Sequence, residues 1–241
     1  MAQPVPPIEH VAALDLKRLN AQFESASPQA IIQWALETIP QGLMQTSAFS
    51  ILVITHMLYR EMAPTPPVPV LFLDTLHHFQ ATLDTVERAH RHYGLDLRVY
   101  RARGVSTRAG FAARYGNRLW ETNINRFHYL TKVEPLERAL NELQIQAWFT
   151  GRRRDQSQNR QTLPILELDS QGRLKINPLA NWTRQQVWTY TLKHGVLYNP
   201  LHDQGFTSIG DEPLTTPIAP GEQERAGRWR GSAKTECGIH V

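Results

Sequence analysis

A single cysteine, Cys237, lies near the C-terminal end of the chain in the polar run Lys234-Thr235-Glu236-Cys237-Gly238-Ile239-His240. A lone cysteine is most often a small buried hydrophobe. The glycine, charged and hydroxyl residues around this one cannot form a core segment. Lys234 and His240 are basic neighbours, and Arg225 and Arg228 add positive charge upstream. Because positive charge favours the thiolate, which is the reactive form, the sequence predicts a nucleophilic cysteine on a polar tail.

A dense group of arginines occupies the segment Gly151-Arg152-Arg153-Arg154-Asp155-Gln156-Ser157 and returns at Arg160. Four guanidiniums this close repel one another unless an anion lies among them. Arginine matches phosphate oxygens with two parallel hydrogen bonds, so a polyphosphate or a sulfated nucleotide is the natural ligand. The alternative is a solvated basic loop, with or without contact to nucleic acid, and this feature alone does not decide between them.

Two further polar stretches are candidates for nucleotide contacts. Asp74 and Thr75 follow an apolar run, where an aspartate could accept a hydrogen bond from a ribose hydroxyl. The stretch Thr46-Ser47-Ala48-Phe49-Ser50 leads into the apolar segment 51–58. As a turn from a strand to a helix it would offer hydroxyls and backbone N–H groups to a phosphate. Simple helix capping explains the same residues equally well.

The elements that must position these residues alternate between strands and helices. Continuous apolar runs at 70–73 and 147–150 are typical of strands buried on both faces. Helical periodicity and capping signals appear between and around them. The predicted strands are 70–73, 97–100 and 147–150, and the predicted helices are 28–39, 83–93, 135–143 and 184–194. This alternation predicts an α/β fold with a mostly parallel sheet, helices on both faces and ligands at the carboxyl ends of the strands.

The chain divides into three parts by composition. Residues 1–27 begin with three prolines in seven positions and predict a loosely held arm. Residues 28–220 form the predicted nucleotide-binding domain, and residues 221–241 the predicted catalytic tail. Glycine, proline and charge dominate from Asn199 onward, so the C-terminal part is expected to be rich in loops.

Composition excludes several classes of protein. The 26 lysines and arginines against 22 aspartates and glutamates give +4, which permits an anionic partner without requiring one. The best apolar run, near 49–54, stops at Thr55 and His56, well short of the roughly 18 residues that cross a bilayer. The first residues lack the features of a secretory signal. We therefore expect a cytoplasmic protein without a membrane span.

One cysteine cannot form an internal disulfide or the multi-cysteine cages that hold structural zinc and iron–sulfur clusters. The histidine pairs His77-His78 and His90-x-His92 have no carboxylate or cysteine at ligand spacing. We expect ordinary surface histidines and no bound metal.

Taken together, several stretches make the chain similar to the phosphoadenylyl sulfate (PAPS) reductase family over about residues 31–240. The matching stretches are Val70 to Thr75, Lys132-Val133-Glu134-Pro135-Leu136, Arg153 to Arg160, Ser208-Ile209-Gly210-Asp211 and Glu236-Cys237-Gly238-Ile239-His240. The last is the most specific. The resemblance implies an adenine-nucleotide α-hydrolase-like fold. It also implies reduction of PAPS to sulfite and adenosine 3′,5′-bisphosphate through a cysteine S-sulfonate, as in sulfate assimilation.

The resemblance also implies roles for individual residues. Cys237 would be the nucleophile and His240 a second catalytic residue. Lys132, Arg225 and Arg228 would surround the phosphosulfate. The residues matched to the nucleotide-binding loops are Ser47, Asp74, Arg153, Arg154, Gln156 and Arg160. Reduced thioredoxin, or glutaredoxin, would be the protein partner. No bound cofactor, iron–sulfur cluster or nucleic acid is expected, and a homodimer is left open.

One departure within the wider family bears on the substrate. Related reductases of adenylyl sulfate (APS) generally carry a four-cysteine iron–sulfur cluster. Its ligands are a cysteine pair ahead of the Lys-Val-Glu-Pro stretch and a Cys-x-x-Cys after Ser-Ile-Gly. Phe127-His128 and Asp211-x-x-Leu214 occupy those places here. The resemblance therefore favours PAPS, and a cluster-free APS reductase is the alternative.

Two other functions are weaker. ATP pyrophosphatases of the same fold carry a Ser-Gly-Gly-x-Asp-Ser loop, which is replaced here by Ser47-Ala48-Phe49-Ser50. Without those glycines the backbone cannot approach a pyrophosphate in the same way. A nucleotide sensor or RNA-binding module built on the basic loop is the non-enzymatic alternative, and it would not need Cys237.

Overall fold

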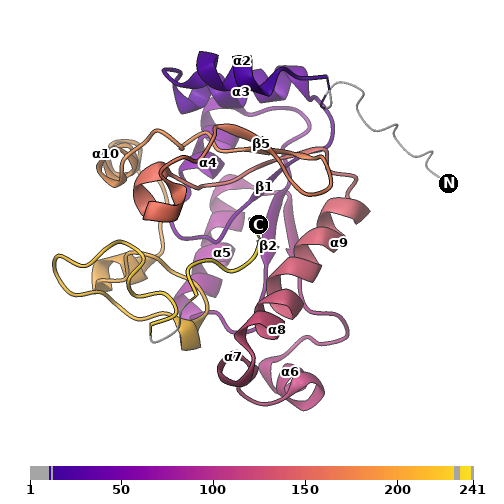
Figure 1. The fold of residues 1–241 in the computed structure, drawn as a ribbon, viewed down its shortest axis with the longest axis vertical. Coiled ribbons are helices and arrows are strands. Elements are labelled where there is room, and N and C mark those ends of the chain that lie inside the picture. The colour runs from indigo at the N-terminus through magenta and orange to yellow at the C-terminus, as the bar shows by residue number, and fades with distance from the viewer. Residues whose placement is uncertain (1–10, 12, 231–233, 240–241) are drawn as a thin grey trace.

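In the structure, a computed structural model that describes residues 11, 13–230 and 234–239, one six-stranded sheet forms the centre of the fold (Figure 1). The strands lie in the order β3-β2-β1-β4-β6-β5. Their bounds are β1 Leu43–Thr46, β2 Val70–Leu73, β3 Leu97–Tyr100, β4 Ala147–Phe149, β5 Leu166–Leu168 and β6 Leu174–Ile176. Neighbouring strands pair in parallel except at one edge, where β5 is antiparallel to β6. The mostly parallel sheet is confirmed.

Helices connect the strands. The α-helices are α2 Leu16–Phe23, α3 Pro28–Thr38, α4 Val53–His56, α5 Gln80–Tyr93, α6 Arg108–Tyr115, α7 Leu119–Thr122, α8 Ile124–His128, α9 Glu134–Glu142 and α10 Arg184–His194. Two π-helical segments, η1 Met57–Met62 and η2 Tyr129–Val133, continue α4 and α8. Short 3-10 turns are η3 Arg154–Gln156, η4 Gln158–Arg160, η5 Pro200–Gln204 and η6 Glu212–Leu214.

Local capping signals in the sequence mark where two of the predicted helices begin and where one of them ends. The Ser27 hydroxyl accepts from the Ala30 N–H at 3.2 Å at the start of α3. Thr183 and Gln186 form a capping box at the start of α10, and Gly195 closes that helix in the left-handed conformation. These contacts are local, so the sequence alone predicts them.

Helices cover both faces of the sheet, as predicted. Met44, Leu71 and Trp148 pack on the α9 side. Val70 and Phe72, which alternate with Leu71 along β2, belong to the larger core that includes α3, α4 and α5. Figure 1 shows α9 on one side of the strands and α4 and α5 on the other. Burial of both faces explains the continuous apolar runs in the sequence.

The N-terminal segment is packed more tightly than its sequence suggests. Leu19 and Phe23 of α2 are buried in the main core. The Asn20 side chain donates to the Leu166 carbonyl at 2.9 Å and accepts from its N–H at 2.8 Å, which ties α2 to the edge strand β5. The described part of residues 1–27 is therefore docked on the domain, not loosely held. Residues 1–10 and 12 lie outside the described residues.

The prediction that His77 is a surface histidine is wrong, because its side chain is buried and the residue is 1% exposed. Its ring lies 5.0–5.2 Å from the rings of Phe111, Trp120 and Phe127. Burial lowers the pKa of His77 and so favours the neutral ring. The sequence could not reveal this environment, because the aromatic partners come from a later part of the chain.

The strand order reverses beside β1. The chain runs outward from β1 through β2 to β3 and then returns to β4 on the other side of β1. Open parallel sheets bind ligands at the carboxyl ends of the strands beside such a reversal. The loops that follow β1 and β4, residues 47–52 and 150–153, lie at this point. No described helix combines the length and the apolar character that a bilayer crossing requires.

Candidate active site

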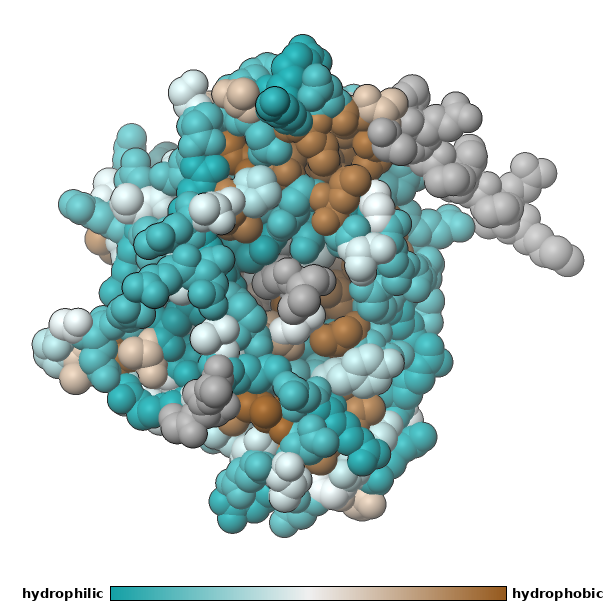
Figure 2. All heavy atoms as spheres, in the orientation of Figure 1, coloured by the Kyte–Doolittle hydropathy of each residue, from teal (hydrophilic) through white to brown (hydrophobic). Residues whose placement is uncertain are grey.

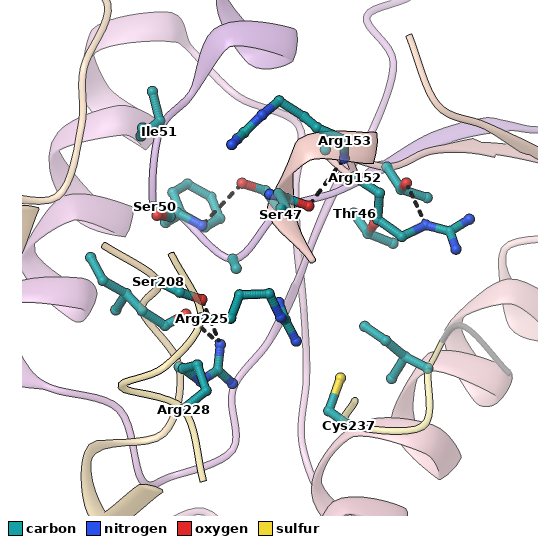
Figure 3. A pocket seen from close by; sticks show the side chains of 18 of the residues that line it. Thr46, Ser47, Ser50, Ile51, Arg152, Arg153, Ser208, Arg225, Arg228 and Cys237 are labelled. Atoms are coloured by element: carbon teal, nitrogen blue, oxygen red, sulfur yellow. Dashed lines mark hydrogen bonds between the residues drawn. The ribbon is translucent and has the colours of Figure 1, made fainter. Parts of the chain in front are cut away.

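The loop after β1 forms one wall of a cavity at the carboxyl edge of the sheet (Figure 3). The Ser47 hydroxyl accepts from the Phe49 N–H at 3.2 Å, and Phe49, at φ 50°, is fully buried. Ser50 and the His202 ring are hydrogen-bonded at 2.8 Å. The buried Phe49 side chain anchors the loop, so that the Ser47 side chain lines the cavity. The predicted turn from a strand to a helix is confirmed.

The loop after β4, the strand next to β1, brings arginines to the same cavity. Arg153 donates from Nε to Asp155 at 2.8 Å and from Nη2 to Glu224 at 2.6 Å. Its own N–H donates to the Gln156 side chain at 3.0 Å, which fixes the turn. Arg152 is buried and pairs with Glu167. The guanidiniums are thus separated by carboxylates of the same chain, a form of charge compensation that the sequence did not show.

Glu236 ties the C-terminal tail to this wall. Arg160 donates from Nε and Nη2 to the two oxygens of Glu236, each at 2.8 Å. Arg225 donates to the same carboxylate at 3.1 Å. Because Glu236 precedes Cys237, these bonds hold the thiol at the cavity, and the Cys237 side chain projects toward the arginines in Figure 3.

Arg228 lies between the cavity and Trp229. Its guanidinium carbon is 4.5 Å from the Trp229 ring centre, a cation–π contact. It donates to the Ser208 hydroxyl at 3.4 Å and to the Ile209 carbonyl at 3.2 Å, and its Nε is buried without a hydrogen-bond partner among the described residues. A Cβ added at Gly210 would lie 2.1 Å from the Arg228 Nη2. Glycine at 210 therefore makes room for this guanidinium.

The electrostatics of the cavity favour an anion. Burial, followed by repulsion from Arg160, lowers the pKa of Arg152 and of Arg225 to about 10. Burial also lowers the pKa of Arg228, and the negative charge of Asp211 acts in the opposite direction. A lowered arginine pKa means that the positive charge is costly to keep there. An anionic ligand would relieve that cost.

Lys132 is positioned by a buried acid. Its amine forms an ion pair with Asp211, which is fully buried. Burial would raise the pKa of Asp211, but the charge of Lys132 outweighs that effect and holds the pKa well below its usual range. The His128 Nε2 lies 3.7 Å from the Asp211 carboxylate and accepts from the Trp229 indole N–H at 3.3 Å. The network fixes the Lys132 ammonium at the cavity wall beside the tail.

Residues 43–217 match the family described as the phosphoadenosine phosphosulfate reductase domain. The chain belongs to the phosphoadenosine phosphosulfate (PAPS) reductase family. A phosphoadenosine phosphosulfate reductase of Emericella nidulans is 45% identical over 229 residues, which cover 93% of this chain and 74% of the relative. An adenosine 5′-phosphosulfate reductase of Salinibacter ruber is 42% identical over 230 residues, 94% of this chain and 88% of that one.

A solved member of the PAPS reductase family has the same fold. The crystal structure of the Candida auris PAPS reductase in a phosphate complex matches with a TM-score of 0.76 and 42% identity. The match covers 83% of this chain and 96% of that one. The adenine-nucleotide α-hydrolase-like fold and the family resemblance expected from the sequence are therefore confirmed, and the chain is an oxidoreductase of this family.

Most of the predicted site residues come together around the one cavity. Those that line it are Ser47, Lys132, Arg153, Gln156, Arg160, Arg225, Arg228 and Cys237. They come from the loops after β1 and β4, from η2 and from the tail, and Figure 2 shows the same face of the molecule as mainly hydrophilic. His240 lies outside the described residues, so its role stays a prediction.

Two predicted residues lie elsewhere. Asp74 pairs with the Arg101 Nε at 2.6 Å and accepts from the Leu76 N–H at 2.9 Å, and it does not line the cavity. Arg154 pairs with Glu24 near the end of α2 and donates to the Leu163 carbonyl at 2.8 Å. In this structure neither residue lines the cavity, and their contact with the nucleotide stays a prediction. Their charges are used to fix a turn and to dock the N-terminal segment.

Sequence reasoning missed the carboxylates of the site. Asp211 holds Lys132, and Glu236 holds Arg160 and Arg225. Both belong to stretches that resemble the PAPS reductase family, so a signal was present. Their role was not evident, because each pairs with a base far away in the sequence.

Proposed function

We propose that the chain reduces PAPS to sulfite and adenosine 3′,5′-bisphosphate, with reduced thioredoxin or glutaredoxin as electron donor, in sulfate assimilation in the cytoplasm. The observation that carries this proposal is the convergence of one thiol, Cys237, with arginines and a lysine at a single cavity. Membership of the PAPS reductase family supports it.

Binding would depend on the positive wall. Arg160, Arg225 and Arg228 offer guanidinium donors to phosphate and sulfate oxygens, and charge-assisted bonds of this kind are the strong ones. Ser47 and the backbone of its loop would contact the nucleotide at the end of β1. Glu236 now occupies donors of Arg160 and Arg225, so a bound phosphosulfate would share or replace that carboxylate.

In the first step the Cys237 thiolate attacks the sulfur of the sulfate group. A new S–S bond forms and the bond from sulfur to the phosphate oxygen breaks, which releases adenosine 3′,5′-bisphosphate and leaves a Cys237 S-sulfonate. Arg225, Arg228 and Lys132 would stabilise the charge that moves onto the leaving phosphate. The leaving group is already a phosphate, so no strong acid is needed.

In the second step a thiolate of reduced thioredoxin attacks the Cys237 sulfur and sulfite leaves. The resulting mixed disulfide is opened by the second thiol of thioredoxin. Thioredoxin is oxidised to its disulfide, and the sulfate sulfur gains the two electrons as sulfite. The single cysteine supplies the one thiol that this chemistry requires and offers no ligand set for an iron–sulfur cluster.

A cluster-free reductase of APS is the second candidate, because the Salinibacter ruber relative is named as an adenosine 5′-phosphosulfate reductase. The two substrates differ by the 3′-phosphate. Comparison of kcat/KM for PAPS and APS with the same donor decides between them.

The test of the chemistry is a single turnover with PAPS. Wild-type protein should carry one SO₃ group on the peptide that contains Cys237, detected by mass spectrometry, and should release sulfite when thioredoxin is added. Cys237→Ser should bind adenosine 3′,5′-bisphosphate nearly as well but form no sulfite, because a serine hydroxyl is a much poorer nucleophile than a thiolate. Appreciable sulfite from this variant would rule out the mechanism.

A further inference from the structure

Three metal-ligating side chains meet at a place that the active site does not use. His56, Glu61 and His194 each offer a ligand atom, and these atoms all lie within 4.8 Å of one another. None of the three lines the active-site cavity. His56 and Glu61 come from the α4–η1 helix, and His194 is the last residue of α10, which packs against α4.

The π-helical segment accounts for the pairing of His56 with Glu61. In an α-helix, residues five apart point in directions about 140° different, because each residue turns the chain by about 100°. In a π-helix the bonds join residues five apart, so such residues lie nearly above one another. The Ala63 N–H donates to the Leu58 carbonyl at 2.9 Å, a bond of this kind. The unusual helix thus puts an imidazole and a carboxylate on one side.

The ring geometry suits a shared ion. The centres of the His56 and His194 rings are 5.9 Å apart. A Zn–N bond of about 2.0–2.1 Å places a ring centre about 3.2 Å from the ion, so two histidine ligands have centres about 5–6 Å apart. Glu61 and His194 are exposed, which leaves space for water ligands.

Outer contacts hold the ligands in place. Tyr190 donates to one oxygen of Glu61 at 2.5 Å, and its ring stacks on His194 with centres 4.3 Å apart. The Tyr93 hydroxyl lies 3.4 Å from the His56 Nδ1. Partners of this kind fix ring orientation in metal sites. Burial, outweighing the attraction of Glu61, lowers the pKa of His56 and so favours the neutral imidazole that metals require.

One nearby cation opposes a metal but is engaged elsewhere. The Arg60 guanidinium donates to the His92 carbonyl and lies over the Tyr93 ring, with its carbon 5.3 Å from the ring centre. Two imidazoles and one carboxylate form a ligand set suited to Zn²⁺ and similar divalent ions. We propose that His56, Glu61 and His194 form a binding site for a divalent transition-metal ion of the zinc class. The ion would link the η1 segment to the C-terminal end of α10.

The test is equilibrium dialysis of untagged full-length protein against Zn²⁺, with bound zinc measured by mass spectrometry. The Cys237→Ser variant is used throughout, because a thiolate is itself a zinc ligand. We expect one zinc per chain. Changing the exposed His194 to Gln in this background should weaken binding at least ten-fold, and Glu61→Gln should also weaken it. His90→Gln, at an exposed histidine outside the group, is the matched control and should change nothing.

A second measurement separates binding from folding. Zinc should raise the melting temperature of the Cys237→Ser protein, because a ligand that binds only the folded state stabilises it. Zinc should not raise the melting temperature of the variant that also carries His194→Gln. Co²⁺ should give visible absorption bands with the Cys237→Ser protein and not with the variant that also carries His194→Gln. Equal zinc binding in the two proteins, or loss of zinc in the His90→Gln control, would overturn the proposal.

Discussion

Gly210→Ala is expected to weaken anion binding without unfolding the chain. The new Cβ would lie 2.1 Å from the Arg228 Nη2 and 2.3 Å from its Cζ, whereas non-bonded heavy atoms prefer about 3.5–4.0 Å. The guanidinium must therefore retreat by more than about 1 Å. The atoms that overlap belong to the end of a flexible side chain, and the φ angle of Gly210 is not in the left-handed region, so the backbone accepts alanine.

The size of the effect follows from the contact that is lost. A charge-assisted hydrogen bond contributes roughly 1.5–3 kcal/mol. At about 1.4 kcal/mol for each factor of ten, binding of adenosine 3′,5′-bisphosphate or PAPS should weaken by about 10- to 150-fold. Isothermal titration measures this directly, and thermal melting checks the fold. Ser208→Ala is the control, because it removes only a 3.4 Å contact of Arg228 and adds no atom.

Arg228→Gln should weaken binding of the bisphosphate by about as much as Gly210→Ala, because both variants remove the guanidinium from its position. If both variants melt like the wild type and bind the bisphosphate within about two-fold of it, Arg228 does not contact the anion. The explanation given for glycine at position 210 would then be wrong.

Two further predictions concern charge. Arg160→Ala should weaken PAPS binding at least ten-fold in the same titration. Arg154→Ala should change PAPS binding by less than about two-fold and lower the free energy of unfolding by only about 0–1 kcal/mol, because Arg154 pairs with Glu24 outside the cavity. Equal losses of binding in the two variants would place Arg154 at the ligand. Burial lowers the pKa of His202 to about 4, against about 6.5 in an unfolded chain. Between these pH values the unfolded state binds a proton that the folded state does not. The free energy of unfolding should therefore fall as the pH drops from about 6.5 to about 4. His202→Gln should reduce this fall in urea unfolding curves at about pH 7 and about pH 4.5, and an unchanged fall would assign it to other groups.

The sequence predicts those features that depend on neighbouring residues. The capping box at Thr183 and the buried run at 70–73 are local signals, and the corresponding helix and strand were found at the expected places. Docking of α2 was not predictable, because the sequence does not show that Asn20 meets Leu166, 146 residues away.

The same limit applies to the site. Charge and spacing predicted an anion cavity with Cys237, and the structure brings those residues together. They could not predict that Arg154 pairs with Glu24, 130 residues earlier, or that Asp74 pairs with Arg101. The group of His56, Glu61 and His194 could not be predicted from the sequence either, because His194 comes from α10, a distant part of the chain.

The bonds from Arg160 and Arg225 to Glu236 imply competition at the cavity. A free anion that enters between these arginines must displace a carboxylate that is tethered to the same chain and that loses no translational freedom when it returns. A small singly charged ion, such as chloride, replaces one negative charge with another and gains little. A nucleotide that carries several charged groups can also engage Arg228 and Lys132. The tail would therefore act as a filter that selects ligands by their number of charges.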